Sequence, residues 1–486
     1  MFTTAMTRRE LLWQSGGGLG GIALASLLGN HQATAATDGS GGLAGLPHHA
    51  PRAKRVIQLF MAGAASHVDL FDYKPELIKR HGQEANFGEK VEAFQNGLGP
   101  WLKPIWQFKP HGQSGKMLAD IVAPLGSVAD EIAFVHNMVG KTGVHSQSTY
   151  LQATGFQNPG YPGMGCWVSY GLGSMNQNLP TFVVLPDHRG FASNGPKNWD
   201  SAFLPTQHQG TILRPGSANP IEDLFPAKQG DFISAKSGRA SMDMLKALNQ
   251  KHLQRSDGDT RLEARIQSYE LAARMQLAAP EAMDISHEPK HILKMYGLDS
   301  DPGSFSKEIN APEEIHHFST KCLVARRLLE RGVRFVQIFH RGWDQHGSLP
   351  RDLASQCKDV DRACYGLVQD LKQRGLLDDT LVIWGGEFGR TVYSQGGLSK
   401  ENYGRDHHPR CFSAWMAGGG VKGGHVHGAT DEFGYNIVKD PVHVHDLHAT
   451  MQHLLGVDHE RQTFKFQGRY YRLTDVAGTV VKGVVA

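Results

Sequence analysis

Two helix–glycine–strand units constrain the fold of this 486-residue chain more than any other feature. A helical pattern at 314–331 leads through a glycine into an apolar strand at 334–340, and another at 352–374 leads through a glycine into a strand at 380–384. Units of this kind place strands side by side and parallel, with helices packed on both faces of the sheet. The sequence therefore predicts an α/β fold with a mostly parallel sheet sandwiched by helices.

The rest of the chain extends this pattern without an internal repeat or a clear linker. We expect one domain over 51–486, with a helical insertion at about 230–310. Further strands are predicted at 55–61, 132–135, 181–185 and 411–416, and further helices at 145–154, 163–171 and 446–455.

The N-terminus has the features of an export signal. Arg8 and Arg9 precede a mildly apolar run at 17–28, and small residues follow at 33–36. Paired arginines in this context indicate twin-arginine export and cleavage after residues 1–36. An apolar run of about 12 residues is too short to span a bilayer. We therefore expect a periplasmic or secreted mature chain without a membrane span, beginning with a flexible lead-in at 37–50.

The composition excludes several classes of protein. Lys and Arg number 50 against 47 Asp and Glu, so the net charge of +3 provides no field that would attract nucleic acid. Five cysteines are widely spaced without a C-x-x-C pattern, which argues against a zinc finger and against a disulfide scaffold. Hydrophobic residues make up 40% and charged residues 20%, as in globular proteins.

Histidine is unevenly distributed. Nine of the 26 histidines fall within residues 401–460, where an even spread would place about three. Because imidazole is a common metal ligand and titrates near neutral pH, this clustering indicates a metal or proton-transfer site.

Carboxylates and imidazoles lie where the predicted strands end. In a parallel sheet, ligands bind beyond the carboxyl ends of the strands, so we expect these side chains to converge. Together they suit Zn²⁺, Mn²⁺, Mg²⁺ or Ca²⁺. The candidate metal ligands are Asp69, Asp344, His346, Glu387, His407 and His408.

Each candidate has a structural alternative. Asp69 could cap a turn, Asp344 and His346 could form loop hydrogen bonds, and Glu387 could lie in a solvated turn. Adjacent His407 and His408 point in different directions, so one of them is expected to be a ligand, and the sequence leaves open which one.

A helix predicted to begin at His145 supplies a candidate catalytic pair. A helix N-terminus offers free N–H groups and a positive dipole end, which suit an oxyanion. Ser146 could be a nucleophile activated by His145, or simply a capping serine.

Several motifs taken together carry a family resemblance over nearly the whole mature chain. They are SHVDLFDYKP, NLPTFVVLPD, RGWDQHG, GLLDDTLVIWGGEFGRT, GRDHHPRCFSAWMAGGG and HVHDLHATMQHLLGVDHE. The chain resembles an exported bacterial family catalogued as domain of unknown function 1501, within the alkaline-phosphatase/sulfatase-like superfamily. The resemblance implies one or two divalent metals at strand ends and attack on a phosphate or sulfate ester.

Carried over residue by residue, the resemblance gives each candidate a position. Asp69 matches the first-strand carboxylate, and Asp344 with His346 matches a pair of metal ligands. Glu387 matches the aspartate of an Asp-His pair, and His407 or His408 matches a late histidine.

Two departures from the superfamily pattern bear on the chemistry. Phe388 stands where the histidine of the Asp-His pair belongs, which removes one ligand. No C/S-x-P-x-R motif is present, so formylglycine chemistry is not expected, and aligning Thr154-Gly155 with the end of that motif puts His145 at the nucleophile position. The nucleophile could be Ser146 or a metal-activated water.

The sequence therefore predicts an exported, metal-dependent hydrolase of phosphate or sulfate esters. Its partner would be an anionic ester, such as a sulfated or phosphorylated glycan. The alternative is a catalytically inactive protein that keeps the fold and binds such a glycan.

Overall fold

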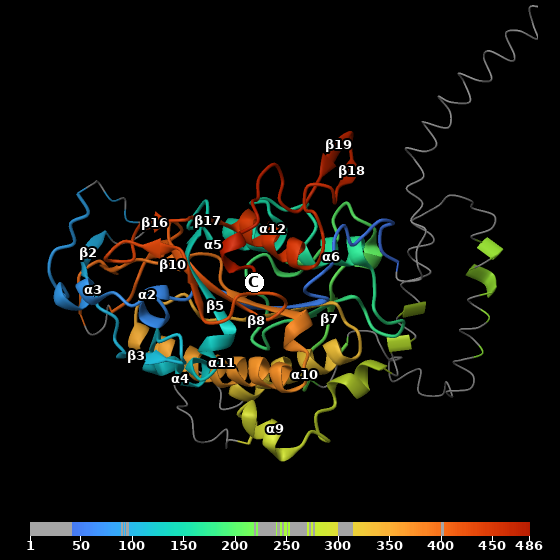
Figure 1. The fold of residues 1–486 in the computed structure, drawn as a ribbon, viewed down its shortest axis with the longest axis horizontal. Coiled ribbons are helices and arrows are strands. Elements are labelled where there is room, and N and C mark those ends of the chain that lie inside the picture. Colours follow the sequence, from blue (N-terminus) through green and yellow to red (C-terminus); the bar gives the residue numbers. More distant parts are fainter. Residues whose placement is uncertain are drawn as a thin grey trace, which may run out of the picture.

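The computed structural model describes residues 41–88, 97–217, 278–299, 314–399 and 403–486, with scattered residues between 88 and 97 and between 217 and 278 (Figure 1). The predicted export signal at 1–36 lies outside the described residues. Most of the predicted helical insertion also lies outside them, and within it α9 (Lys290–Met295) is a helix.

A nine-stranded mixed sheet forms the centre of the molecule (Figure 1). Its order is β14-β5-β13-β9-β1-β8-β6-β7, with β17 beside β5. All neighbours are parallel except that β13 runs antiparallel to β5 and β9. The strands are β1 (Arg55–Met61), β5 (Ile132–Val139), β6 (Phe182–Leu185), β7 (Thr211–Ile212), β8 (Phe335–His340), β9 (Thr380–Gly385), β13 (Phe412–Ala417), β14 (His425–His427) and β17 (Val442–His443). The predicted fold class is confirmed.

Helices cover both faces of the sheet, and Figure 1 shows them above and below it. Strand β1 shows why both faces must be covered: Ile57 and Leu59 enter one apolar core, while Val56 and Phe60 enter the other. The first core includes residues of α4 (Ala123–Gly126), α10 (Glu314–Glu330) and α11 (Leu349–Gln373), and the second includes residues of α5 (His145–Thr154), α6 (Met164–Leu172) and α12 (Val444–Leu454).

Short elements surround this framework. Small helices are α2 (His67–Leu70) and α3 (Pro75–Lys79). Paired two-stranded elements are β2 (Leu98–Trp101) with β11 (Tyr393–Gln395), β3 (Phe108–His111) with β4 (Lys116–Ala119), β10 (Gly389–Arg390) with β12 (His407–His408), β15 (Ala429–Thr430) with β16 (Ile437–Lys439), and β18 (Phe464–Phe466) with β19 (Arg469–Tyr471).

One edge of the sheet collects the polar loops. Strands β1, β5, β8 and β9 run in the same direction, so the loops that follow them leave at the same edge. Because β13 is antiparallel to its neighbours, the segment that precedes it, including β12, reaches this edge as well. The strand direction therefore brings residues 403–411 to the loops that follow the other strands.

The segment 41–50 differs from the prediction of a flexible lead-in at 37–50. The backbone N–H of Leu43 donates to Gly171 O at 2.8 Å, and that of His48 donates to Gly456 O at 2.8 Å. Leu46 packs against the second apolar core, which includes residues of α5, α6 and α12. Backbone hydrogen bonds and apolar contacts hold this part of the segment against the domain, which the glycine-rich composition did not indicate.

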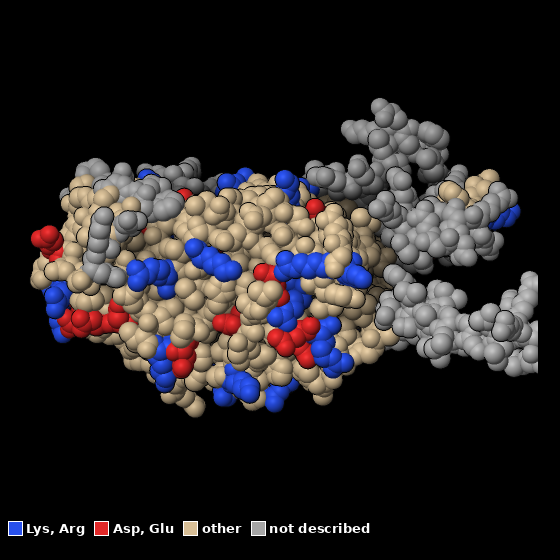
Figure 2. Space-filling model, turned by 90° about the horizontal axis from the view of Figure 1, so that it is seen from above, with Lys and Arg blue, Asp and Glu red and all other residues tan. Residues whose placement is uncertain are grey.

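The surface agrees with the near-neutral composition. In the face shown in Figure 2, side chains of both signs are interspersed.

All five cysteines are buried free thiols. Among the helices that the structure describes, none is long and apolar enough to cross a bilayer.

Candidate metal centre

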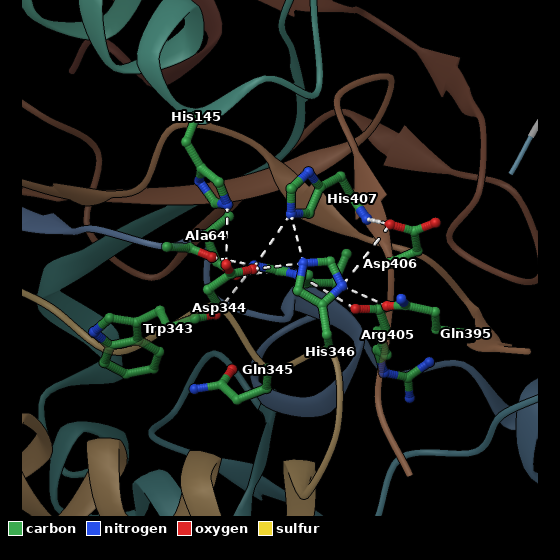
Figure 3. Close-up of polar contacts among 12 residues, drawn as sticks. Ala64, His145, Trp343, Asp344, Gln345, His346, Gln395, Arg405, Asp406 and His407 are labelled. Atoms are coloured by element: carbon green, nitrogen blue, oxygen red, sulfur yellow. Dashed lines mark hydrogen bonds and ion pairs between the residues drawn. The ribbon is translucent and has the colours of Figure 1, made fainter. Parts of the chain in front are cut away.

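Three segments at this edge bring a carboxylate and three imidazoles together (Figure 3). His145 is the first residue of α5, which follows β5, and Asp344 and His346 follow β8. His407 lies in β12, where it pairs in register with Arg390 of β10. Figure 3 shows the four side chains pointing toward one another. The convergence predicted for the strand ends is therefore present for these residues.

Three of the donor atoms form a compact triangle. Asp344 Oδ1 lies 2.9 Å from His346 Nε2 and 3.3 Å from His407 Nε2, and the two imidazole atoms are 2.9 Å apart. Tetrahedral ligands with bonds of about 2.0–2.1 Å to Zn²⁺ lie roughly 3.4 Å from one another. The spacing of the triangle is therefore close to that of a metal site.

The outward nitrogen of each imidazole donates to an oxygen. His346 Nδ1 donates to Gln395 Oε1, and His407 Nδ1 donates to Gly143 O at 2.6 Å. These bonds direct the lone pairs of both Nε2 atoms into the triangle. A histidine that binds a metal commonly donates its other N–H to a carbonyl or carboxylate in this way.

Glu387 holds His145 through the ring nitrogen that does not face Asp344. His145 Nδ1 donates to Glu387 Oε1 at 2.7 Å, and that oxygen also accepts from the Gly63 N–H at 2.9 Å. His145 Nε2 lies 3.3 Å from Asp344 Oδ2. One ligand atom from each of His145, Asp344 and His407 fits within 4.8 Å. Glu387 therefore orients His145, whose Nε2 faces the cluster.

The carboxylates determine the charge of His145. Burial would lower its pKa, but hydrogen bonds and charge from Asp344 and Glu387 outweigh burial and raise the pKa to about 9. Burial likewise opposes ionisation of Asp344, yet His145, His346, His407 and the Arg390 guanidinium hold its pKa well below the usual range. Asp344 is thus a carboxylate at neutral pH.

The donor set fits a divalent cation that accepts both nitrogen and oxygen ligands. Imidazole nitrogens with one carboxylate suit Zn²⁺ or Mn²⁺, whereas Ca²⁺ and Mg²⁺ prefer oxygen ligands. The Asp344 side chain is 43% exposed and that of His407 is 4% exposed. The cluster therefore opens to solvent beside Asp344, where a ligand can approach.

Phe388 occupies the position where the resemblance would place the histidine of the Asp-His pair. Its ring centroid lies 4.9 Å from that of His145 and 4.6 Å from that of His407. The buried phenyl ring packs against both imidazoles and offers no ligand atom.

The structure places Asp69 in an ion pair instead of in the cluster. Asp69 Oδ2 lies 2.6 Å from Arg405 Nε and Oδ1 lies 3.1 Å from Arg405 Nη2, with both side chains fully buried. Ser66 Oγ also donates to Oδ2 at 2.5 Å. The guanidinium thus occupies both oxygens of the carboxylate that the sequence assigned to a metal.

Of the two adjacent histidines, His407 is the one that joins the cluster. Successive side chains of a strand point to opposite sides. His408 Nε2 donates to Tyr435 O at 2.7 Å, and burial lowers its pKa to about 3. His408 is thus a neutral, buried structural residue and not a ligand in this arrangement.

Ser146 lies next to the cluster in sequence, with an exposed side chain at the second position of α5. Its backbone carbonyl accepts from Asn194 Nδ2 at 2.8 Å.

Sequence reasoning missed Arg390 and Gln395, which bind Asp344 and His346. Arg390 lies three residues after Glu387, a spacing that could have suggested it, whereas no signal in the sequence indicated Gln395.

These observations define the class of protein. It is an α/β protein with a histidine-rich candidate metal centre at one edge of its sheet. The model of the family described as "Protein of unknown function (DUF1501)" matches residues 53–485, and the chain belongs to that family. The search of curated proteins finds no match.

Solved structures show distant similarity. Ps i-CgsB is 10% identical, with 84% of this chain and 74% of that chain covered and a TM-score of 0.36. The PsFucS1 sulfatase from Pseudoalteromonas sp. is 12% identical, with 84% and 69% covered and a TM-score of 0.34. The alkaline phosphatase from the Antarctic bacterium TAB5 is 14% identical, with 76% and 92% covered and a TM-score of 0.28.

Proposed function

We propose that this chain is an exported, metal-dependent hydrolase of phosphate or sulfate esters that acts without formylglycine. The observation that supports it most is the pair of facing Nε2 atoms of His346 and His407, 2.9 Å apart beside Asp344 Oδ1. Two imidazole lone pairs directed at each other at this distance repel unless a proton or a cation lies between them. A divalent cation satisfies both and is neutralised in part by Asp344.

The residues that would hold the cation are Asp344, His346 and His407, with His145 within reach. When bound there, a divalent cation supplies positive charge that polarises a phosphoryl or sulfuryl oxygen and favours attack by a nucleophile. Gln395 and Gly143 O fix the two imidazoles, so the donor atoms are in place before the ligand arrives.

His145 has the properties of a group that meets developing negative charge. Its raised pKa keeps the imidazole protonated at neutral pH in the metal-free protein, and Glu387 holds the ring in position. In its protonated form, the imidazole at the start of α5, beside the free N–H groups of the first helical turn, can stabilise an oxyanion or give a proton to a leaving oxygen. Ser146 and water are the two candidate nucleophiles.

The substrate would be an anionic ester, and a sulfated or phosphorylated glycan is the proposed natural form. An extracytoplasmic location would expose the enzyme to such polymers. Arg390 and a bound cation would together offset Asp344 and Glu387, which leaves the mouth of the cluster able to accept an anion.

The test uses the mature chain, freed of metal by chelation and reloaded with Zn²⁺ or Mn²⁺. Aryl phosphate mono- and diesters and aryl sulfates would be assayed, and bound metal measured by mass spectrometry. We expect turnover of at least one ester that is lost in Asp344→Asn and kept in Asp378→Asn, a matched change at an exposed aspartate. A folded protein that neither retains a divalent ion nor hydrolyses any of these esters would contradict the proposal.

Export is tested separately. Changing Arg8 and Arg9 to lysine in the full chain should retain the protein in the cytoplasm, measured by fractionation. Export unaffected by this change would contradict the twin-arginine route.

Phe388 favours a second candidate function, a binding protein for sulfated or phosphorylated glycans. An apolar ring in a ligand position weakens the case for a complete catalytic set. Equilibrium binding of such glycans by a chain that hydrolyses none of the esters would support this candidate, whereas turnover abolished in Asp344→Asn would eliminate it.

A further inference from the structure

Arg390 places a permanent positive charge against the candidate metal centre. Its side chain is fully buried, and Nη2 lies 2.5 Å from Asp344 Oδ1. Nε donates to Ala64 O at 3.0 Å, and Nη1 donates to Arg405 O at 3.2 Å. The guanidinium therefore joins the loop after β1, the loop after β8 and the segment before β12, and all three of its nitrogens have acceptors.

The loop after β1 approaches the Asp344 loop too closely to leave space between them. Gly63 has a φ of +112°, and a Cβ there would lie 2.6 Å from the Asp344 nitrogen and 2.8 Å from the Trp343 nitrogen. This loop contributes its carbonyl groups to Arg390 and contains the sequence Ala62-Gly63-Ala64-Ala65, without a side-chain ligand.

The first carboxylate after that loop, Asp69 in α2, is neutralised by a second arginine. Asp69 pairs with Arg405, and Arg405 also donates to Thr391 O at 3.0 Å and Leu102 O at 3.1 Å. Both side chains of the pair are fully buried, and Ser66 Oγ also donates to Asp69 Oδ2. Removing one partner of a buried ion pair leaves an uncompensated charge, so Asp69 is not available to another cation without a large cost.

We propose that the centre is mononuclear, and that the Arg390 guanidinium supplies its second positive charge. This inference rests on the proposed function, because it assumes that Asp344, His346 and His407 hold a divalent cation. The ion would bind on the imidazole side of Asp344, while Arg390 binds the same carboxylate from inside the protein. Together they would give the site a fixed cation and an exchangeable one.

Metal stoichiometry tests this proposal independently of turnover. The metal-free mature chain would be titrated calorimetrically with Zn²⁺ and with Mn²⁺, and crystals of the loaded protein measured at the absorption edge of the ion. We expect one ion per chain, and one anomalous peak next to Asp344, His346 and His407. Binding should weaken at least tenfold in His407→Gln.

The Asp69 site provides the control. Because Asp69→Asn leaves Arg405 unpaired and could unfold the chain, the double change Asp69→Asn/Arg405→Gln accompanies it. One ion per chain should remain in whichever of these variants folds. Two ions in the unchanged chain, or loss of an ion from the Asp69 variants, would overturn the mononuclear centre while leaving hydrolysis intact. No bound ion at all, with no turnover, would overturn the proposed function and this inference with it.

Discussion

The Nε2 atoms of His346 and His407 lie 2.9 Å apart, on rings whose Nδ1–H groups are both committed to oxygen acceptors. The acceptors come from different parts of the chain, Gln395 from β11 and Gly143 from the loop after β5. This arrangement fixes both rings without using the atoms that face the centre.

His407→Gln should lower the affinity for Zn²⁺ by about 10–100-fold or more, because loss of a ligand costs at least as much as loss of a residue that supports one. Calorimetric titration of the metal-free chain measures it. His425→Gln, at a partly exposed histidine of β14, is the matched control and should leave the affinity unchanged. Equal affinities in both variants would place the metal elsewhere.

Glu387→Gln should lower the pKa of His145 from about 9, because the charge that favours the imidazolium is removed while the shape of the side chain is kept. NMR titration of His145 in the metal-free protein measures the shift. We also expect kcat/KM to fall about 10–100-fold, since the imidazole loses its orienting carboxylate. An unchanged His145 pKa would show that Glu387 does not hold this ring in solution.

Phe388→His should raise the affinity for Zn²⁺ about tenfold or more. The new imidazole would stand beside His145 and His407, whose rings now contact the phenyl ring, and could add a ligand atom. Phe388→Leu keeps an apolar side chain and is the control, with an expected change below threefold. Metal binding weaker in the histidine variant than in the leucine variant would contradict this expectation.

Arg405→Met should destabilise the protein by about 3–5 kcal/mol, because Asp69 would be left as a buried charge without its partner. The double change Asp69→Leu/Arg405→Met should recover most of this loss, since it removes both charges together. Urea unfolding of the three proteins gives the free energies. A double variant as unstable as the single one would mean that packing, and not the unpaired charge, dominates.

Asp361 should make stability depend on pH in the direction opposite to that of an ordinary salt-bridged carboxylate. It is buried, accepts from the Leu125 N–H at 3.1 Å, and burial raises its pKa to about 8. Because the folded pKa exceeds the unfolded one, its contribution is complete below about pH 4 and is lost as the pH rises through about 8.

Asp361→Asn keeps a neutral group at this position and should flatten that part of the stability profile. The expected slope in the unchanged chain is on the order of 1 kcal/mol per pH unit between pH 5 and 8. Thermal unfolding at several pH values measures both proteins. Identical profiles would show that Asp361 is not protonated in the fold.

Local sequence patterns determined the framework of this protein. The apolar run at 55–61 became β1 and the helix predicted at 145–154 became α5, both with the same bounds, and the helix–glycine–strand units became part of the parallel sheet. A short continuous apolar run is typical of a strand that is buried on both faces, as β1 is. A second rule, that ligands bind beyond the carboxyl ends of parallel strands, predicted the convergence of Asp344, His346, Glu387 and His407.

Only the tertiary structure decided which polar side chains meet. Asp69 and Arg405 are 336 residues apart in sequence and Asp69 looked as suitable for a metal as Asp344, yet a guanidinium reaches the first and three imidazoles reach the second. Likewise, the pairing of β12 with β10 turns His407 inward and His408 toward Tyr435. A carboxylate in sequence has no fixed partner, because its partner depends on long-range register and on which charged group the packing brings within about 3 Å.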